Sequence, residues 1–161
     1  MKNFNHISIK LVATVLFAML LGTSCEQNKW LDWKVENELW LENNKTNAGI
    51  NTSHSGLQYS IISNPDPLGK RPNASSLVSI TYTGTLIDGT VFDSGTYNQY
   101  LYNSIEGWQE GICYMREHSD AIFYIPYELA YGDQKKGTEG LSNFLPPYST
   151  LIFKVHLNSV N

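Results

Sequence analysis

The sequence has little cysteine, no long apolar run and no cluster of basic residues, and each absence excludes a class of protein. Only two cysteines occur, Cys25 and Cys113, which excludes a framework of several disulfides. The longest nearly unbroken apolar stretch, Leu11–Leu21, has about eleven residues, well short of the roughly 20 that a membrane-spanning helix needs. Because no Lys/Arg run follows the first ten residues and the net charge is -4, we do not expect a nucleic-acid partner.

The overall composition of the chain is that of a folded protein. With 42% hydrophobic and 16% charged residues, the 161-residue chain is too apolar for a disordered protein and has the length of one domain. No Cys/His arrangement supports nucleophilic catalysis. Metal-ligand spacing is also missing among the four histidines, His6, His54, His118 and His156. We therefore expect neither a metal nor a cofactor.

The first 24 residues have the pattern of a signal peptide. Lys2 and Lys10 give a positive start, an apolar stretch follows, and small residues precede Cys25 in the sequence LLGTSC. This resembles a bacterial lipobox, which implies that Cys25 is acylated and holds an exported protein at a membrane of the cell envelope, facing the periplasm. Gly22 stands where a lipobox usually has a large aliphatic residue, and ordinary signal cleavage nearby is the alternative.

The mature chain is predicted to begin with a helix and a linker. Residues Asn28–Asn44 contain no Gly or Pro, and packing of this helix on the domain is favoured over contact with a partner. Asn43–Gly56 is rich in Asn, Thr, Ser and Gly, which is typical of a linker. The expected organisation is a signal peptide (1–24), a lipidated N-terminus with helix and linker (25–54), and a domain (55–161). The apolar residues of the helix fall on two faces, one with Trp30, Trp33, Trp40 and Leu41, the other with Leu31, Val35 and Leu39.

Beyond the linker the pattern is that of a half-buried antiparallel sheet. Apolar residues alternate with polar ones or form short runs, which predicts strands at Leu57–Ser63, around Val78–Tyr82, at Ala121–Ile125 and at Leu151–Leu157. Asp88-Gly89, set between two apolar pairs, predicts a hairpin with a type I′ turn.

A single short helix is predicted in this part of the chain. Trp108, Ile112 and Met115 lie on one helical face at spacings of four and three. The apolar face of the sheet must be covered, and this helix is the best element to do so. The expected fold class is α+β, a twisted antiparallel sheet curled around one short helix.

Four separated motifs resemble the FKBP-type peptidyl-prolyl cis/trans isomerase family, and they occur in the family's order. They are VSITYTGTLIDGTVFDS (Val78–Ser94), IEGWQEGICYM (Ile105–Met115), IPYELAYG (Ile125–Gly132) and FLPPYSTLIFKVHL (Phe144–Leu157). Together they spread across most of residues 55–161. The resemblance implies an apolar pocket between sheet and helix that accepts a proline ring.

The resemblance also assigns site residues. Trp108 is implied as the pocket floor, Asp93 as the polar residue at the rim, and Ile105 as the donor of a backbone N–H to a substrate carbonyl. Taken alone, Asp93 is equally well explained as a hairpin-end residue that bonds nearby backbone N–H groups. The implied walls are Tyr82, Phe92, Tyr131 and Phe153, and a loop with Phe144 and Leu145 overhangs the site.

The reaction implied by the resemblance needs no nucleophile. Rotation about an X-Pro bond faces a barrier of about 18 to 20 kcal/mol because amide resonance is lost, and no covalent bond breaks. A dry pocket with fixed donors can stabilise the twisted amide over either planar isomer. We expect the Tyr131 hydroxyl and the Ile105 N–H to be these donors, acting on unfolded or Pro-containing exported polypeptides and assisting their folding.

The chain departs from the family pattern near the implied pocket. Only fourteen residues separate Asp93 from Trp108, so a wall aromatic is lost that Tyr97, Tyr100 or Tyr102 would have to replace. Ser104 stands where the family has a branched aliphatic residue, which should weaken proline or macrolide binding, and the segment Asp133–Asn143 is longer than usual. The alternative function is therefore a membrane-anchored binding module or chaperone with this fold and little isomerase activity.

Overall fold

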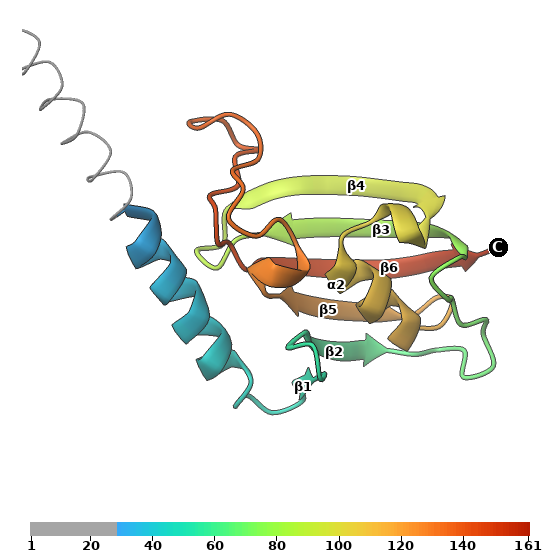
Figure 1. The fold of residues 1–161 in the computed structure, drawn as a ribbon. Coiled ribbons are helices and arrows are strands. Elements are labelled where there is room, and N and C mark those ends of the chain that lie inside the picture. Colours follow the sequence, from blue (N-terminus) through green and yellow to red (C-terminus); the bar gives the residue numbers. More distant parts are fainter. Residues whose placement is uncertain (1–28) are drawn as a thin grey trace, which may run out of the picture.

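The computed structural model describes residues 29–161, and the predicted signal peptide and Cys25 lie outside the described residues. A six-stranded antiparallel sheet with the order β1-β2-β5-β6-β3-β4 forms most of the structure (Figure 1). The antiparallel α+β fold is thus confirmed. In chain order the strands are β1 Asn51–Thr52, β2 Gln58–Ser63, β3 Leu77–Thr85, β4 Val91–Tyr100, β5 Asp120–Ile125 and β6 Leu151–Val160.

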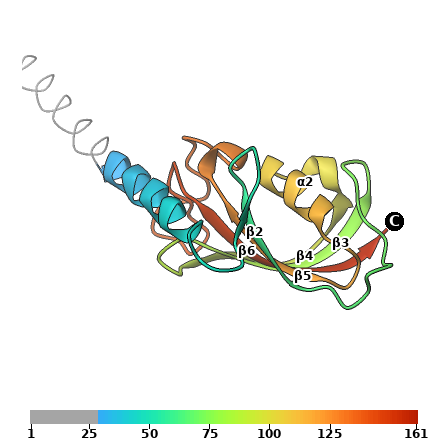
Figure 2. The same ribbon diagram turned by 90° about the horizontal axis from the view of Figure 1, so that it is seen from below.

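One short α-helix, α2 (Glu106–Gly111), lies on one face of the sheet, which curls around it (Figure 2). The predicted apolar face is correct, since Trp108, Ile112 and Met115 are all buried. The α-helix is shorter than their spacing predicts, because the chain tightens into a 3-10 turn after Gly111. The three 3-10 turns among the described residues are η1 Leu101–Asn103, η2 Ile112–Tyr114 and η3 Tyr127–Leu129.

Two glycines let α2 approach the sheet closely. Gly107 and Gly111 lie one helical turn apart and both face β5. A Cβ at Gly111 would lie 2.9 Å from the Phe123 ring, and one at Gly107 would overlap the side chain of Ile125. The α2 backbone therefore rests directly on β5 side chains, and the intervening Trp108 enters the core.

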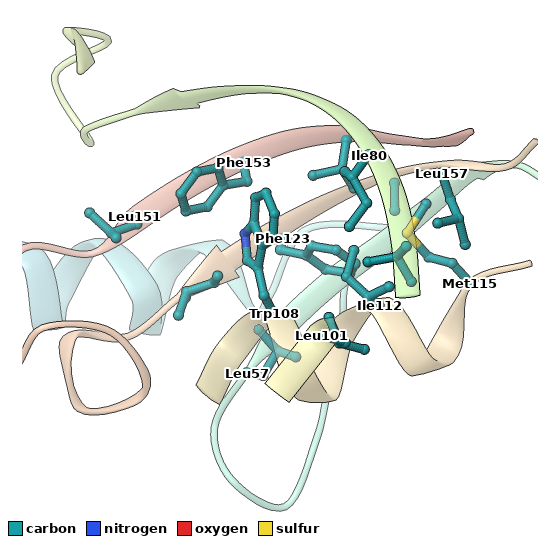
Figure 3. Packing of buried hydrophobic residues seen from close by; sticks show 14 of the residues in the cluster. Leu57, Ile80, Leu101, Trp108, Ile112, Met115, Phe123, Leu151, Phe153 and Leu157 are labelled. Atoms are coloured by element: carbon teal, nitrogen blue, oxygen red, sulfur yellow. The ribbon is translucent and has the colours of Figure 1, made fainter. Parts of the chain in front are cut away.

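The core fills the space between α2 and the concave face of the sheet (Figure 3). Along β6 buried and less buried residues alternate, as predicted for a strand with one covered face. Phe123 of β5 and Ile80 of β3 are fully buried and lie near Ile112 in the same cluster. The helix and three adjacent strands thus share one apolar core.

The β3–β4 hairpin is present, but its predicted turn type is wrong. A type I′ turn needs positive φ at two successive positions, and in this hairpin only Gly89 has it, with φ 86°. The Gly89 N–H donates to Leu86 O at 3.0 Å, and the Leu86 N–H donates to Thr90 O at 2.9 Å. The loop is therefore longer than two residues and places Gly89 at the last position of the turn, where its freedom in φ is required.

A helix at residues 29–44, the N-terminal helix, lies beside one end of the domain (Figure 1). Its Trp-rich face packs against the domain. Trp30 is buried near Phe144, with ring centroids 6.1 Å apart, while Trp40 lies 5.7 Å from Tyr124. Buried Asn44 donates to Gln58 Oε1 at 2.9 Å. The opposite face, with Leu31, Val35 and Leu39, is exposed. The segment predicted as a linker follows, and within it Asn51 and Thr52 form β1.

We predict that Gly107→Ala destabilises the protein by about 1 to 3 kcal/mol, because the new methyl group overlaps Ile125 in a packed core. The free energy of unfolding in urea measures this. The control is Glu106→Ala, an exposed neighbour on the same helix, which should change stability by less than about 0.5 kcal/mol. Equal stability of the two variants would contradict the close packing of α2 on β5.

Candidate functional site

A cavity of about 350 Å³ opens between α2 and the sheet. It receives side chains from β3, β4, β6 and α2 and from the segments that flank α2 and follow η3. The residues that line it are Tyr82, Asp93, Tyr97, Asn103, Ser104, Ile105, Trp108, Tyr131 and Phe153. Seven of the ten predicted site residues within the described chain line this cavity: Tyr82, Asp93, Ser104, Ile105, Trp108, Tyr131 and Phe153.

Trp108 forms the buried base of this cavity, and three aromatic rings meet it edge to face. The ring centroids lie 5.1 Å away for Tyr82, 5.4 Å for Tyr97 and 5.1 Å for Phe153. Figure 3 shows Trp108 and Phe153 adjacent, with Trp108 rising from the α2 side toward the sheet. Because edge-to-face contacts at these distances are favourable, the rings hold one another in place. The four rings of Trp108, Tyr82, Tyr97 and Phe153 thus form a concave apolar surface, which we call the aromatic bowl.

Gly84 explains how two phenylalanines fit beside this bowl. It pairs with Asp93 on one side and Phe153 on the other in the sheet. A Cβ at Gly84 would lie 2.6 Å from Phe92 Cζ and 2.8 Å from Phe153 Cε1. The Phe92 and Phe153 rings therefore meet over this glycine, with centroids 5.5 Å apart. Phe92 does not line the cavity and instead packs against the ring of the wall residue Phe153.

Polar groups at the mouth of the cavity are linked to one another. The Tyr82 hydroxyl donates to Asp93 Oδ2 at 2.7 Å. Burial, and then this hydrogen bond and the nearby carboxylate charge, raise the pKa of Tyr82 to about 12. Burial and the charge of Asp93 also raise the pKa of Tyr131. Both phenols are protonated near neutral pH, as an ordinary tyrosine is, and can donate hydrogen bonds; the shifts move their ionisation to still higher pH.

Ile105 is the N-cap residue of α2, with φ -63° and ψ 152°. Its carbonyl accepts the first hydrogen bonds of the helix, from Trp108 and Gln109. Its N–H has no acceptor within residues 29–161, as expected for a free amide at a helix start. Ser104 precedes it and turns its hydroxyl to Leu101 O at 2.6 Å. A free backbone donor thus lies in the cavity wall.

One tyrosine replaces the wall aromatic that is lost in the shortened segment after Asp93. Residues Val91–Tyr100 continue as the single strand β4, which brings Tyr97 onto Trp108 as a wall. Tyr100 and Tyr102 do not line the cavity and stack on each other at 5.3 Å. Asn103 also lines the cavity, and sequence reasoning missed it. Its position two residues before Ile105 was the one signal that could have indicated it.

The predicted overhanging residues lie elsewhere. Phe144 packs on Trp30 and lines a different cavity, between the N-terminal helix and the long loop, which we define as residues 133–143. Leu145 is buried in the core cluster. The long loop is held by a bridge between Lys136 and Leu145. Neither Phe144 nor Leu145 lines the cavity over Trp108 in this structure.

The arrangement suits binding more than covalent chemistry. The cavity has an apolar floor, one carboxylate and three phenols, those of Tyr82, Tyr97 and Tyr131, and no cysteine or lysine lines it. Within residues 29–161, no group of three or more His, Cys, Asp or Glu side chains is placed to hold a metal ion. In the same residues no helix has both the length and the apolar character needed to cross a membrane. The geometry can hold a compact apolar ring beside a few hydrogen-bond donors.

Comparison with known sequences identifies relatives. The sequence model described as FKBP-type peptidyl-prolyl cis-trans isomerase matches residues 69–158. A protein named probable FKBP-type peptidyl-prolyl cis-trans isomerase FkpA, from Neisseria meningitidis serogroup B, is 40% identical over 129 residues, covering 77% of this chain and 45% of that protein. Outer membrane protein MIP of Legionella longbeachae is 40% identical over 150 residues, covering 88% of this chain and 60% of that protein. The chain therefore spans about half the length of the curated relatives it matches.

Solved structures agree with this comparison. The crystal structure of FkpA from Escherichia coli matches with a TM-score of 0.79 and 29% identity, covering 99% of this chain and 73% of that chain. The crystal structure of AtFKBP13 matches with a TM-score of 0.58 and 31% identity, covering 70% of this chain and 98% of that chain. The first match includes the N-terminal helix, since nearly the whole chain is aligned.

We predict that Asp93→Asn lowers the pKa of Tyr82 from about 12 toward its ordinary value of 10, although burial keeps it from falling fully. In the native protein the raised pKa contributes stability that is complete below pH 10 and is lost as pH rises to about 12. NMR of the tyrosine ring carbons during a pH titration measures the pKa, with Tyr82→Phe assigning the signal. An unchanged titration in Asp93→Asn would exclude the Tyr82–Asp93 interaction.

Proposed function

The chain belongs to the FKBP-type peptidyl-prolyl cis-trans isomerase family, and from this premise we propose that it catalyses rotation about X-Pro bonds in polypeptides. The observation that carries the proposal is the aromatic bowl over Trp108 with the free Ile105 N–H in its wall. A proline ring is compact and apolar, and it matches a cavity of about 350 Å³ with an indole floor.

The pocket lowers the barrier by favouring the twisted amide. The barrier of about 18 to 20 kcal/mol comes from amide resonance, which is lost when the C–N bond rotates. The aromatic walls hold the proline ring and exclude water from it. The carbonyl of the preceding residue then rotates against fixed donors, and a donor that bonds this carbonyl better in the twisted form lowers the barrier.

Two donors fit this role, the backbone N–H of Ile105 and the hydroxyl of Tyr131. Ile105 is fixed because it begins α2. The Tyr131 phenol is protonated near neutral pH, since the ordinary pKa of 10 already ensures this and burial raises it further. Asp93 accepts from Tyr82 and so orients this wall residue, and it carries no proton to the substrate. The residues Tyr82, Asp93, Ile105, Trp108, Tyr131 and Phe153 contact the substrate, and Phe92 supports Phe153.

A second candidate function is favoured by the polar side of the pocket. Asn103 and Ser104 add polar side chains to the wall, and Ser104 stands where the family has a branched aliphatic residue, which weakens the binding of a proline ring and of macrolides. A protein of this fold that holds Pro-containing segments with little turnover would then act as a binding module or chaperone. Turnover separates the two functions, since binding without acceleration belongs only to the second.

The proposed location is the bacterial cell envelope. The signal pattern and the sequence before Cys25 favour export and a lipid anchor, with the domain facing the periplasm and acting on exported polypeptides. One relative is itself named an outer membrane protein. Cys25 lies outside the described residues, so this part of the proposal rests on the sequence.

For the isomerase function, we predict that the full chain accelerates cis-to-trans conversion of X-Pro test peptides and that Tyr131→Phe lowers kcat/KM about tenfold, because a donor to the rotating carbonyl is lost. The matched control is Tyr102→Phe, an exposed tyrosine outside the pocket, which should stay within about twofold. No acceleration across varied X residues by a folded protein would reject the isomerase and leave the binding module.

For the anchor, we predict that the protein fractionates with membranes when expressed in a bacterium, and that Cys25→Ala releases it into the soluble fraction, because the lipid attachment atom is gone. Cys113→Ala is the matched control and should remain with membranes. Equal fractionation of both variants would exclude a lipid on Cys25.

A further inference from the structure

We propose that the N-terminal helix positions one wall of the pocket, with Trp33 and Asn37 as the positioning residues. The proposal deepens the isomerase function and rests on it. The helix holds residues 146–150, and this segment in turn holds the chain beside Tyr131 and leads into β6, the strand that carries Phe153. Trp33 and Asn37 lie outside the residues 69–158 that match the family.

Asn37 makes the most buried link between helix and domain. Its side chain is 0% exposed, and so is Thr150, its partner. Asn37 Oδ1 accepts from the Thr150 N–H at 2.7 Å, and Asn37 Nδ2 donates to Trp33 O at 2.8 Å within the helix. Because the buried Asn37 amide makes both hydrogen bonds, it fixes Thr150 relative to the helix. Removing this amide leaves the buried Thr150 N–H unpaired.

Trp33 makes a second link one residue earlier in the same segment. Its indole Nε1 donates to Ser149 Oγ at 3.0 Å, and the Ser149 hydroxyl donates to Pro146 O at 2.8 Å. Ser149 is buried, so these bonds are sheltered from water. The helix therefore fixes the turn at residues 146–149 as well as the start of β6.

Tyr148 connects the held segment to the pocket. It has φ 61°, a conformation that a non-glycine residue keeps only when its surroundings impose it. Its N–H donates to Gly132 O at 2.9 Å, and its ring meets Tyr127 edge to face at 5.4 Å. Lys34 of the helix lies over both rings, at 5.3 Å from Tyr148 and 5.6 Å from Tyr127.

Gly132 connects the held residue Tyr148 to the pocket wall through backbone hydrogen bonds. It is bonded on both sides, since its carbonyl accepts from Tyr148 and its N–H donates to Tyr127 O at 2.8 Å. Tyr131 is its chain neighbour and lines the pocket. A shift of residues 148–150 therefore moves the backbone at Tyr131, and this is the route by which the helix acts on the pocket. A displacement of about 1 Å in a donor is enough to lower the rate strongly.

The test measures kcat and KM for X-Pro peptides with the full chain and three variants. Asn37→Leu removes the acceptor for Thr150 at similar volume, and Trp33→Phe removes the indole N–H while keeping an aromatic ring. Leu39→Ala, on the exposed face of the same helix, is the control. We expect kcat to fall about tenfold in Asn37→Leu and a smaller amount in Trp33→Phe, with KM within about threefold and Leu39→Ala unchanged.

Combining Asn37→Leu with Tyr131→Phe distinguishes positioning from general loss of stability. If the helix acts through Tyr131, Asn37→Leu should change kcat by less than about twofold once the Tyr131 hydroxyl is gone. Equal losses in both backgrounds, or full kcat in both Asn37→Leu and Trp33→Phe, would overturn the proposal.

Amide hydrogen exchange gives a readout that does not need turnover. In Asn37→Leu and Trp33→Phe the N–H groups of Tyr148 and Gly132 should exchange faster, while amides of the central strand β3 keep their protection. If the native chain shows no turnover, the isomerase function fails, and this measurement alone decides the positioning role. Unchanged exchange at Tyr148 and Gly132 would then reject it.

Discussion

The close contact between α2 and β5 is the constraint on which the rest of the structure depends. Gly107 and Gly111 have no side chains, so the helix backbone can rest on Ile125 and Phe123. This distance determines how deeply Trp108 reaches into the core, and its depth decides where Tyr82, Tyr97 and Phe153 can meet it. The pocket is therefore an extension of the core packing, with one side open to solvent.

The polar groups of the pocket are supplied by the ends of the same elements. Ile105 has a free N–H because α2 begins there, and Asp93 reaches Tyr82 because β3 and β4 are adjacent. Tyr131 is different, since it lies in an irregular segment after η3 and needs support from outside the sheet. Its neighbour Gly132 is bonded to Tyr148, which belongs to the segment 148–150 that the N-terminal helix holds. The irregular part of the pocket is thus supported by contacts that reach back to the N-terminal helix.

The sequence predicted local structure better than it predicted contacts between distant segments. Alternation along Leu151–Leu157 correctly indicated a strand with one buried face, and the spacing of Trp108, Ile112 and Met115 correctly indicated a buried face. The type I′ turn at Asp88-Gly89 was wrong, because loop length depends on where the strands stop pairing and this is decided by the whole sheet. Phe144 packs on Trp30, which no local pattern indicates, because the two residues are over a hundred positions apart.

By itself the sequence determined the class of fold and the position of the short helix α2, because periodicity depends on neighbouring residues. Its resemblance to the family indicated most of the aromatic residues around Trp108. Only the tertiary structure decided that Tyr97, and neither Tyr100 nor Tyr102, completes the wall, since this depends on β4 continuing beside β3. It also decided that Phe92 stands behind Phe153 over Gly84 and that Asn37 bonds Thr150. These contacts join residues far apart in the chain, and they form only when the complete core fixes the distances between its elements.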